Sequence, residues 1–131
     1  MQLVPATGGR DAYELVTGTA ANPSPNDLYD PVQNIELGCA YLSIIMDRYL
    51  VGIQDMQSRL YCSICAYNTG AGNVSRAFTG NNYVKPAVAR INNLSPDQVL
   101  AKLKHDLPSR ETKLYIDHVL KRTRYYEEWK N

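Results

Sequence analysis

Apolar residues recur at steps of three and four along most of this chain, a pattern that is typical of amphipathic helices. The clearest stripe follows Asp30 and Pro31, an acid suited to an N-cap and a proline suited to the first helical turn. Its members are Val32, Ile35, Cys39, Leu42, Met46 and Tyr49. Four more apolar residues widen this face: Leu37, Tyr41, Ile44 and Ile45. We therefore expect a central helix that ends at Gly52.

The remaining segments predict further helices between turn-forming residues. We expect an extended entry and a short helix over 1–16, and a loop over 17–30, which is rich in Asn, Pro and Ser. A helix from Asp55 to about Tyr67 has no charge over residues 60–67, which predicts burial nearly all round. Later expected elements are helices over 73–78 and 85–94, a capped helix over 95–105 and a last helix over 110–129. No strand pattern stands out, so the predicted fold class is all-α.

Composition is that of a globular protein, and we expect one domain over residues 1–131. The chain is 44% hydrophobic and 21% charged, which supplies a core and argues against disorder. A formal charge of +1 without a basic stripe gives no support for nucleic-acid binding. We interpret Lys121, Arg122 and Arg124, followed by two glutamates, as a solvated helix end. No apolar run is long enough to span a bilayer, and the N-terminus shows no signal pattern.

Three cysteines, Cys39, Cys62 and Cys65, exclude a fully paired set of disulfides within the chain. Cys62 and Cys65 have the CxxC spacing of a redox pair, but such a pair needs a helix N-terminus to stabilise its thiolate. Here the pair lies among apolar residues inside a predicted helix, so we expect small, buried, free thiols. His105 and His118 lie in later segments and suggest no zinc site with them. We expect neither a metal nor a cofactor.

Four segments, in chain order, resemble motifs of the lytic transglycosylase family of the lysozyme-like superfamily. They are residues 1–5 with Thr7, similar to the end of a Gly-Leu-Met-Gln motif; Asp30-Pro31 with Asn34-Ile35, Gly38 and Tyr41-Leu42, similar to DPxxNIxxGxxYL; residues 66–74, similar to AYNxGxGxV; and Leu107-Pro108 with Glu111-Thr112 and Tyr115, similar to LPxxETxxY. Residues 58–78 are similar to the membrane-bound lytic murein transglycosylase C branch. The resemblance implies a lysozyme-like helical domain, related to goose-type lysozyme, that lacks its first helices.

The resemblance also implies a site that binds peptidoglycan glycan strands. The residues it assigns to substrate binding are Met1, Gln2, Tyr67, Asn68, Gly70, Glu111 and Tyr115. Tyr67 offers an apolar face and a hydroxyl, Asn68 can donate and accept hydrogen bonds, and Gly70 lets the backbone approach a ligand. The plain structural alternatives are a capped helix end at Asn68 and an acid that merely starts a helix at Glu111. For the motif around Asp30 and Tyr41, capping and packing are favoured over contact with substrate.

Lytic transglycosylases cleave the MurNAc–GlcNAc β-1,4 bond and form 1,6-anhydroMurNAc, using one glutamate as general acid and general base. In the family this glutamate precedes the Gly-Leu-Met-Gln motif, inside which this chain begins. We therefore expect the general acid before Met1, no catalytic residue within the chain and no useful activity from the chain alone. Glu14, Glu36 and Glu111 are poor substitutes.

Further expectations follow from the resemblance. An uncovered apolar surface would favour self-association of this chain. The full-length protein is expected in the periplasm or anchored at the outer membrane. Two alternatives to an enzyme domain stay open: a non-catalytic glycan-binding module, and a helical scaffold with no sugar function.

Overall fold

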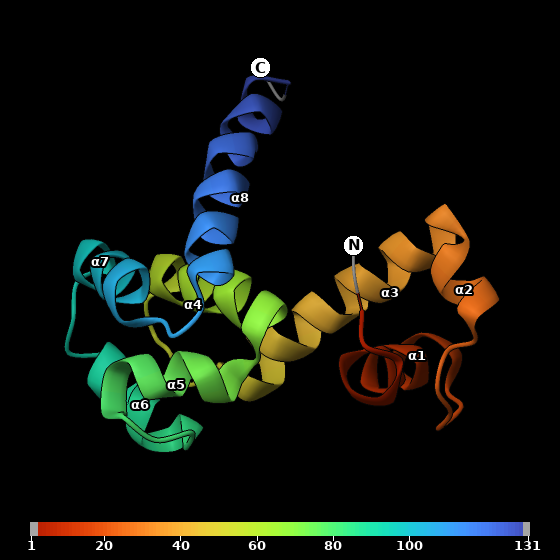
Figure 1. The fold of residues 1–131 in the computed structure, drawn as a ribbon, viewed down its shortest axis with the longest axis horizontal. Helices are drawn as coiled ribbons and strands as arrows, with labels where there is room; N and C mark the ends of the chain where they lie inside the picture. Colours follow the sequence, from red (N-terminus) through yellow and green to blue (C-terminus); the bar gives the residue numbers. More distant parts are fainter. Residues whose placement is uncertain (1–2, 130–131) are drawn as a thin grey trace. The chain divides into compact units, whose positions relative to one another are not determined.

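The computed structural model describes residues 3–129, and all regular secondary structure within that range is helical (Figure 1). In chain order the elements are η1 (Pro5–Gly9), α1 (Arg10–Thr17), α2 (Pro25–Tyr29), α3 (Pro31–Ile44), η2 (Ile45–Tyr49), α4 (Met56–Thr69), α5 (Ala71–Thr79), α6 (Val84–Ile91), α7 (Pro96–Asp106) and α8 (Arg110–Trp129). The predicted all-α class is confirmed. The chain forms two compact units, an N-terminal unit over Met1–Arg48 and a C-terminal unit over Tyr49–Asn131.

In the N-terminal unit, α1 packs against α3 and η1, and α2 packs against α3. The close approach between η1 and α3 depends on Gly8. A Cβ atom at Gly8 would lie 2.5 Å from Cζ of Tyr41, so only a glycine leaves room for this ring. Tyr41 is half-buried, and burial together with the negative charge of Asp11 raises the pKa of its hydroxyl. Tyr41 thus packs the unit, as expected for that motif.

The predicted loop over 17–30 is wrong at its end, because residues 25–29 form α2. Ser24 is its N-cap: the Ser24 side chain accepts from the backbone N–H of Asp27, and the Asp27 carboxylate accepts from the backbone N–H of Ser24. Pro25 occupies the first helical position. These are the start signals of a helix, although the same residue types also populate loops.

Helix α3 begins as predicted, with the Asp30 carboxylate accepting from the backbone N–H of Gln33 at 2.9 Å. The predicted apolar stripe, however, is not its buried face. Val32 is 75% exposed and Ile35 is 56% exposed, whereas the fully covered positions of α3 are Leu37, Gly38 and Ile44. Because this helix is apolar on both faces, periodicity alone did not choose between them. Helical structure also ends at Tyr49, before the predicted Gly52.

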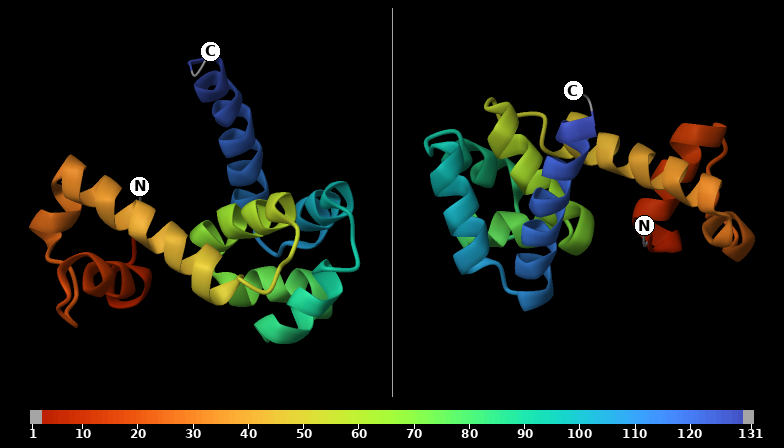
Figure 2. Two further views of the ribbon diagram at one scale, coloured as in Figure 1. Left: turned by 180° about the vertical axis from the view of Figure 1, so that it is seen from behind. Right: turned by 90° about the horizontal axis from the view of Figure 1, so that it is seen from above.

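In the C-terminal unit, α4 contacts α5, α7 and α8, and α5 contacts α6 and α7 (Figures 1 and 2). Asp55 caps α4 by accepting from the backbone N–H of Ser58 at 2.7 Å. The predicted burial of the charge-free part of α4 is confirmed for residues 62–66, whereas Leu60, Tyr61 and Tyr67 at its ends are half-buried. Ser95 and Gln98 form the predicted capping box of α7. Residues 121–128 of α8 are exposed, which confirms the solvated helix end.

We predict that Gly8→Ala lowers the free energy of unfolding by about 1–3 kcal/mol, because the added methyl group overlaps the Tyr41 ring. Gly72→Ala is the matched control. Its Cβ would lie 3.4 Å from the nearest atom, and alanine is the better helix former at this position in α5. Urea unfolding followed by circular dichroism compares the two variants. Equal stability of Gly8→Ala and the unmodified chain would contradict this packing account.

Candidate functional site

The candidate site lies in the C-terminal unit, where the end of α4 meets the beginning of α8. The buried helix α4 carries Tyr67 and Asn68 in its last turn. Gly70 then separates α4 from α5 with φ +89° and ψ 149°, a backbone conformation open essentially to glycine alone. The Gly70 N–H donates to the carbonyl of Ala66 at 2.7 Å. Gly70 is therefore required for the turn that leaves Asn68 exposed at the helix end.

The beginning of α8 supplies Glu111, Thr112 and Tyr115. The Ser109 hydroxyl accepts from the backbone N–H of Thr112 at 3.4 Å, a weak cap of the first turn. Thr112 is buried with 0% exposure, Tyr115 is half-buried, and Glu111 is exposed. Glu111 and Thr112, which are consecutive in one motif, thus point to solvent and to the protein interior, respectively.

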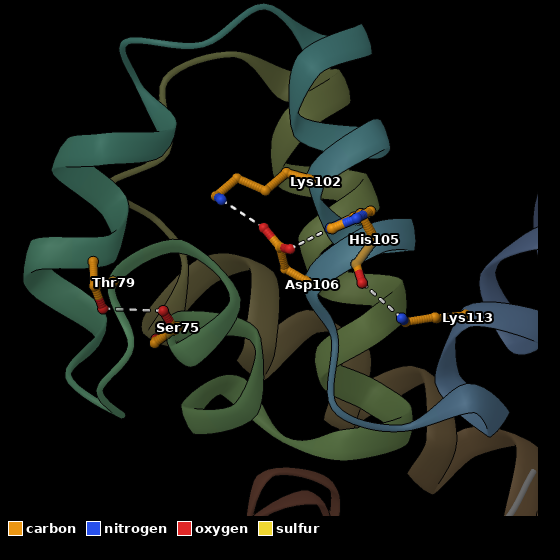
Figure 3. Close-up of polar contacts among 6 residues, drawn as sticks. All are labelled: Ser75, Thr79, Lys102, His105, Asp106 and Lys113. Carbon is orange, nitrogen blue, oxygen red and sulfur yellow. Dashed lines mark hydrogen bonds and ion pairs between the residues drawn. The ribbon is translucent and has the colours of Figure 1, made fainter.

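Polar contacts from α7 hold this part of α8 in place. The Lys113 ammonium donates to the carbonyl of His105 at 2.7 Å, and Lys104 pairs with Asp117 at 2.5 Å. Asp106 ends α7 and accepts from Lys102 and from the His105 ring (Figure 3). The hydrogen bond from Lys102, followed by that from His105, lowers the pKa of Asp106 to about 2.

One hydrogen bond joins the two motifs directly. The hydroxyl of Thr112 donates to the side-chain carbonyl oxygen of Asn68 at 2.8 Å, across 44 residues of sequence. This bond joins the end of α4, which carries Tyr67, Asn68 and Gly70, to the first turns of α8, which carry Glu111 and Tyr115. The resemblance assigned all five residues to substrate binding. The sequence left two alternatives for the Asn68 side chain, its own backbone at a capped helix end or the substrate. The hydroxyl of Thr112, in the motif similar to LPxxETxxY, was the sequence feature that could have indicated this hydrogen bond.

The other predicted site residues stand apart. Met1 and Gln2 lie outside the described residues. Leu3, which follows them, is buried and belongs to the N-terminal unit. The predicted contribution of the first motif therefore stays a prediction.

The electrostatic character of the site is nearly neutral. Burial raises the pKa of the Tyr115 hydroxyl, and the nearby Cys65 thiol adds to that effect. Tyr67 is half-buried, with its hydroxyl oxygen covered. Glu111 is exposed, and no aspartate or glutamate within residues 3–129 is buried. Apart from the exposed carboxylate of Glu111, the side chains at this junction are neutral hydrogen-bonding groups and aromatic rings.

The cysteines behind the site are free, as predicted. Cys62 and Cys65 are buried in α4, and burial raises the pKa of both thiols, that of Cys65 to about 12. Since the reactive species is the thiolate, neither sulfur is suited to redox chemistry near neutral pH. Over residues 3–129 no three His, Cys, Asp or Glu side chains gather into a metal site.

A model of the transglycosylase SLT domain matches residues 1–88, which include three of the four motifs. This chain belongs to the transglycosylase SLT domain family. The SLT-domain chain is also similar to proteins named membrane-bound lytic murein transglycosylase C. It is 43% identical over 116 residues to that of Yersinia enterocolitica (88% of this chain, 32% of the relative). It is 43% identical over 119 residues to that of Pectobacterium atrosepticum (91% and 32%).

A third relative of the same name, from Histophilus somni, is 40% identical over all 131 residues, which correspond to 35% of its own length. The SLT-domain chain thus spans about a third of the length of the curated relatives it matches. No helix formed by residues 3–129 combines the length and apolar character that crossing a membrane requires.

We predict that the three thiols differ in reactivity in the folded chain. Cys39 is exposed and should react with a thiol reagent within minutes at pH 8, whereas Cys62 and Cys65 should stay unmodified. Under denaturing, non-reducing conditions all three should react. Mass spectrometry of the labelled chain counts the modified sites. A Cys62–Cys65 disulfide in the denatured sample, or rapid labelling of either residue in the folded chain, would contradict the assignment.

Proposed function

We propose that this chain is part of the catalytic domain of a peptidoglycan lytic transglycosylase and that the junction of α4 and α8 binds the glycan strand. The carrying observation is the Asn68–Thr112 hydrogen bond, which unites two motifs of the family at one exposed helix end. The names of the relatives, which act on murein, support the same substrate class.

The side chains at this junction suit a sugar strand. The half-buried ring of Tyr67 offers an apolar face, while the Asn68 amide is exposed and polar. A Cβ atom at Gly70 would meet no protein atom within 4 Å, so a ligand can approach the backbone there. Glu111 and Tyr115 add hydrogen-bonding groups from α8.

In the proposed reaction the glycosidic oxygen between MurNAc and GlcNAc accepts a proton from a glutamic acid. The resulting carboxylate then takes the proton of the muramyl 6-hydroxyl as that oxygen attacks the anomeric carbon. The products are 1,6-anhydroMurNAc and a free GlcNAc hydroxyl. An acid with this role needs a raised pKa, which an apolar pocket supplies.

We infer that this glutamate is contributed from outside residues 1–131. Glu14, Glu36 and Glu111 are all exposed, and none is held in an apolar pocket. The relatives are about three times as long as this chain, so they contain residues that can fill the role. We further propose that the longer protein works at the cell envelope, in keeping with the name membrane-bound of those relatives.

A non-catalytic glycan-binding module is the second candidate. The exposure of every carboxylate at the α4–α8 junction favours it, because binding a ground state without an acid lowers no barrier. The two candidates share the binding site and differ in the reaction alone.

We predict that Tyr67→Phe and Asn68→Ala each weaken chitotetraose binding about 2- to 10-fold. Asn68→Ala removes an exposed amide that can hydrogen-bond the sugar, and Tyr67→Phe removes the covered hydroxyl that anchors the sugar-facing ring. The matched controls are Tyr125→Phe, an exposed tyrosine on α8, and Asn93→Ala, an exposed asparagine after α6. Calorimetric titration gives the affinities, and thermal melts give the stabilities. A large loss of melting temperature with unchanged affinity would show that Tyr67 and Asn68 are structural residues.

We predict that residues 1–131 release anhydromuropeptides from peptidoglycan about 10²- to 10⁴-fold more slowly than a chain extended by its native upstream segment. Mass spectrometry of the digest measures both rates. In the extended chain, an upstream Glu→Gln variant should lose this activity, whereas Glu111→Gln should retain the larger part. Comparable rates from both chains would place the acid within residues 1–131, and inactivity of both would favour the binding module.

A further inference from the structure

The geometry points to Thr112 as a positioning residue that fixes the amide of Asn68, so that the site presents N–H donors to a carbonyl oxygen of its ligand. This inference rests on the proposed function for its ligand class, the N-acetylated sugars. It adds Thr112, to which the family resemblance assigned no role, and it specifies that Asn68 acts as a hydrogen-bond donor. Its basis is the hydrogen bond between Thr112 and Asn68 and the environment of each partner.

An asparagine amide has two ends that differ only in oxygen and nitrogen, and an isolated amide can present either one. Here the carbonyl oxygen accepts from the Thr112 hydroxyl at 2.8 Å. Within residues 3–129 the amide nitrogen of Asn68 has no hydrogen-bond partner, and the residue is exposed. The nitrogen, with its two N–H donors, is therefore the end that faces outward.

Thr112 is well placed to enforce this choice. It has no solvent exposure, and its single hydroxyl proton is directed at Asn68. Its β-branched side chain restricts rotation about χ1. The backbone at Thr112 is held by the Ser109 hydroxyl and, one residue later, by the Lys113–His105 contact. Rotation of the amide by 180° would make the Thr112 hydroxyl an acceptor. The hydroxyl proton, which has no access to solvent, would then lose the one acceptor that it has among residues 3–129.

The fixed orientation selects the chemistry of the ligand. A sugar hydroxyl both donates and accepts, so it can satisfy either end of an amide. A carbonyl oxygen accepts only, and it therefore benefits from an amide that is held with its N–H groups outward. On an N-acetylated sugar the acetamido group supplies such an oxygen. We therefore expect discrimination between N-acetylated and plain β-1,4-linked glucose oligomers.

Three variants separate the roles. Thr112→Val keeps the shape but removes the hydroxyl, Thr112→Ser keeps the hydroxyl, and Asn68→Asp keeps the accepting oxygen but removes the N–H donors. Chitotetraose and cellotetraose are titrated into each variant and into the unmodified chain. We expect chitotetraose affinity to fall about 10-fold for Asn68→Asp and about 3-fold for Thr112→Val, and to stay within about 2-fold for Thr112→Ser.

Cellotetraose should bind more weakly to the unmodified chain and respond little to all three substitutions. Chitotetraose affinity unchanged by Thr112→Val or by Asn68→Asp would overturn the inference. Thermal melts accompany every titration. If Thr112→Ser lowers chitotetraose affinity as much as Thr112→Val does, Thr112 has a packing role. That result also overturns the inference.

A ligand-free measurement keeps the inference distinct from the proposed function. In the folded chain the NMR cross-relaxation between the Asn68 amide protons and residue 112 should be weak, because the carbonyl oxygen faces Thr112. It should strengthen in Thr112→Val as the amide samples both orientations. If the unmodified chain binds neither oligosaccharide, the proposed function fails. The inferred recognition of a ligand carbonyl oxygen by Asn68 then fails as well. Equal cross-relaxation in both proteins would overturn the positioning role itself.

Discussion

Helix α4 is buried over residues 62–66, because α5, α7 and α8 pack around that one helix. The C-terminal unit depends on this burial. A helix that is apolar and charge-free for two turns cannot remain in water, so its neighbours are required to cover it. Burial of Cys62 and Cys65 in this core raises the pKa of both thiols and so disfavours the reactive thiolate.

Burial of α4 also determines where polar chemistry can occur. The backbone carbonyls at the end of a buried helix need partners, and the chain has to leave the core there. Gly70 allows a sharp turn, after which α5 begins at once. The side chains just before the turn, Tyr67 and Asn68, are thus brought to the edge of the core. Because α8 packs on the same helix, its first turns meet them there.

The N-terminal unit follows a different constraint, the close contact between Gly8 and the Tyr41 ring. In the same unit one face of α3 packs against η1 and α1, while Val32 and Ile35 stay exposed. Asp30 and Pro31 start the helix without deciding which of its faces is covered. In the motif that begins with them, Asp30 caps α3 and Tyr41 packs against η1.

The sequence by itself determined where α3, α4 and α7 start and which family the chain belongs to. The caps at Asp30, Asp55 and Ser95 act within four residues, so they can be read locally. The tertiary structure decided the covered face of α3, because two apolar faces were available. It also decided the partner of Asn68. Thr112 lies 44 residues away, and no local rule specifies a side-chain hydrogen bond over that distance, since it forms only after α4 and α8 have packed.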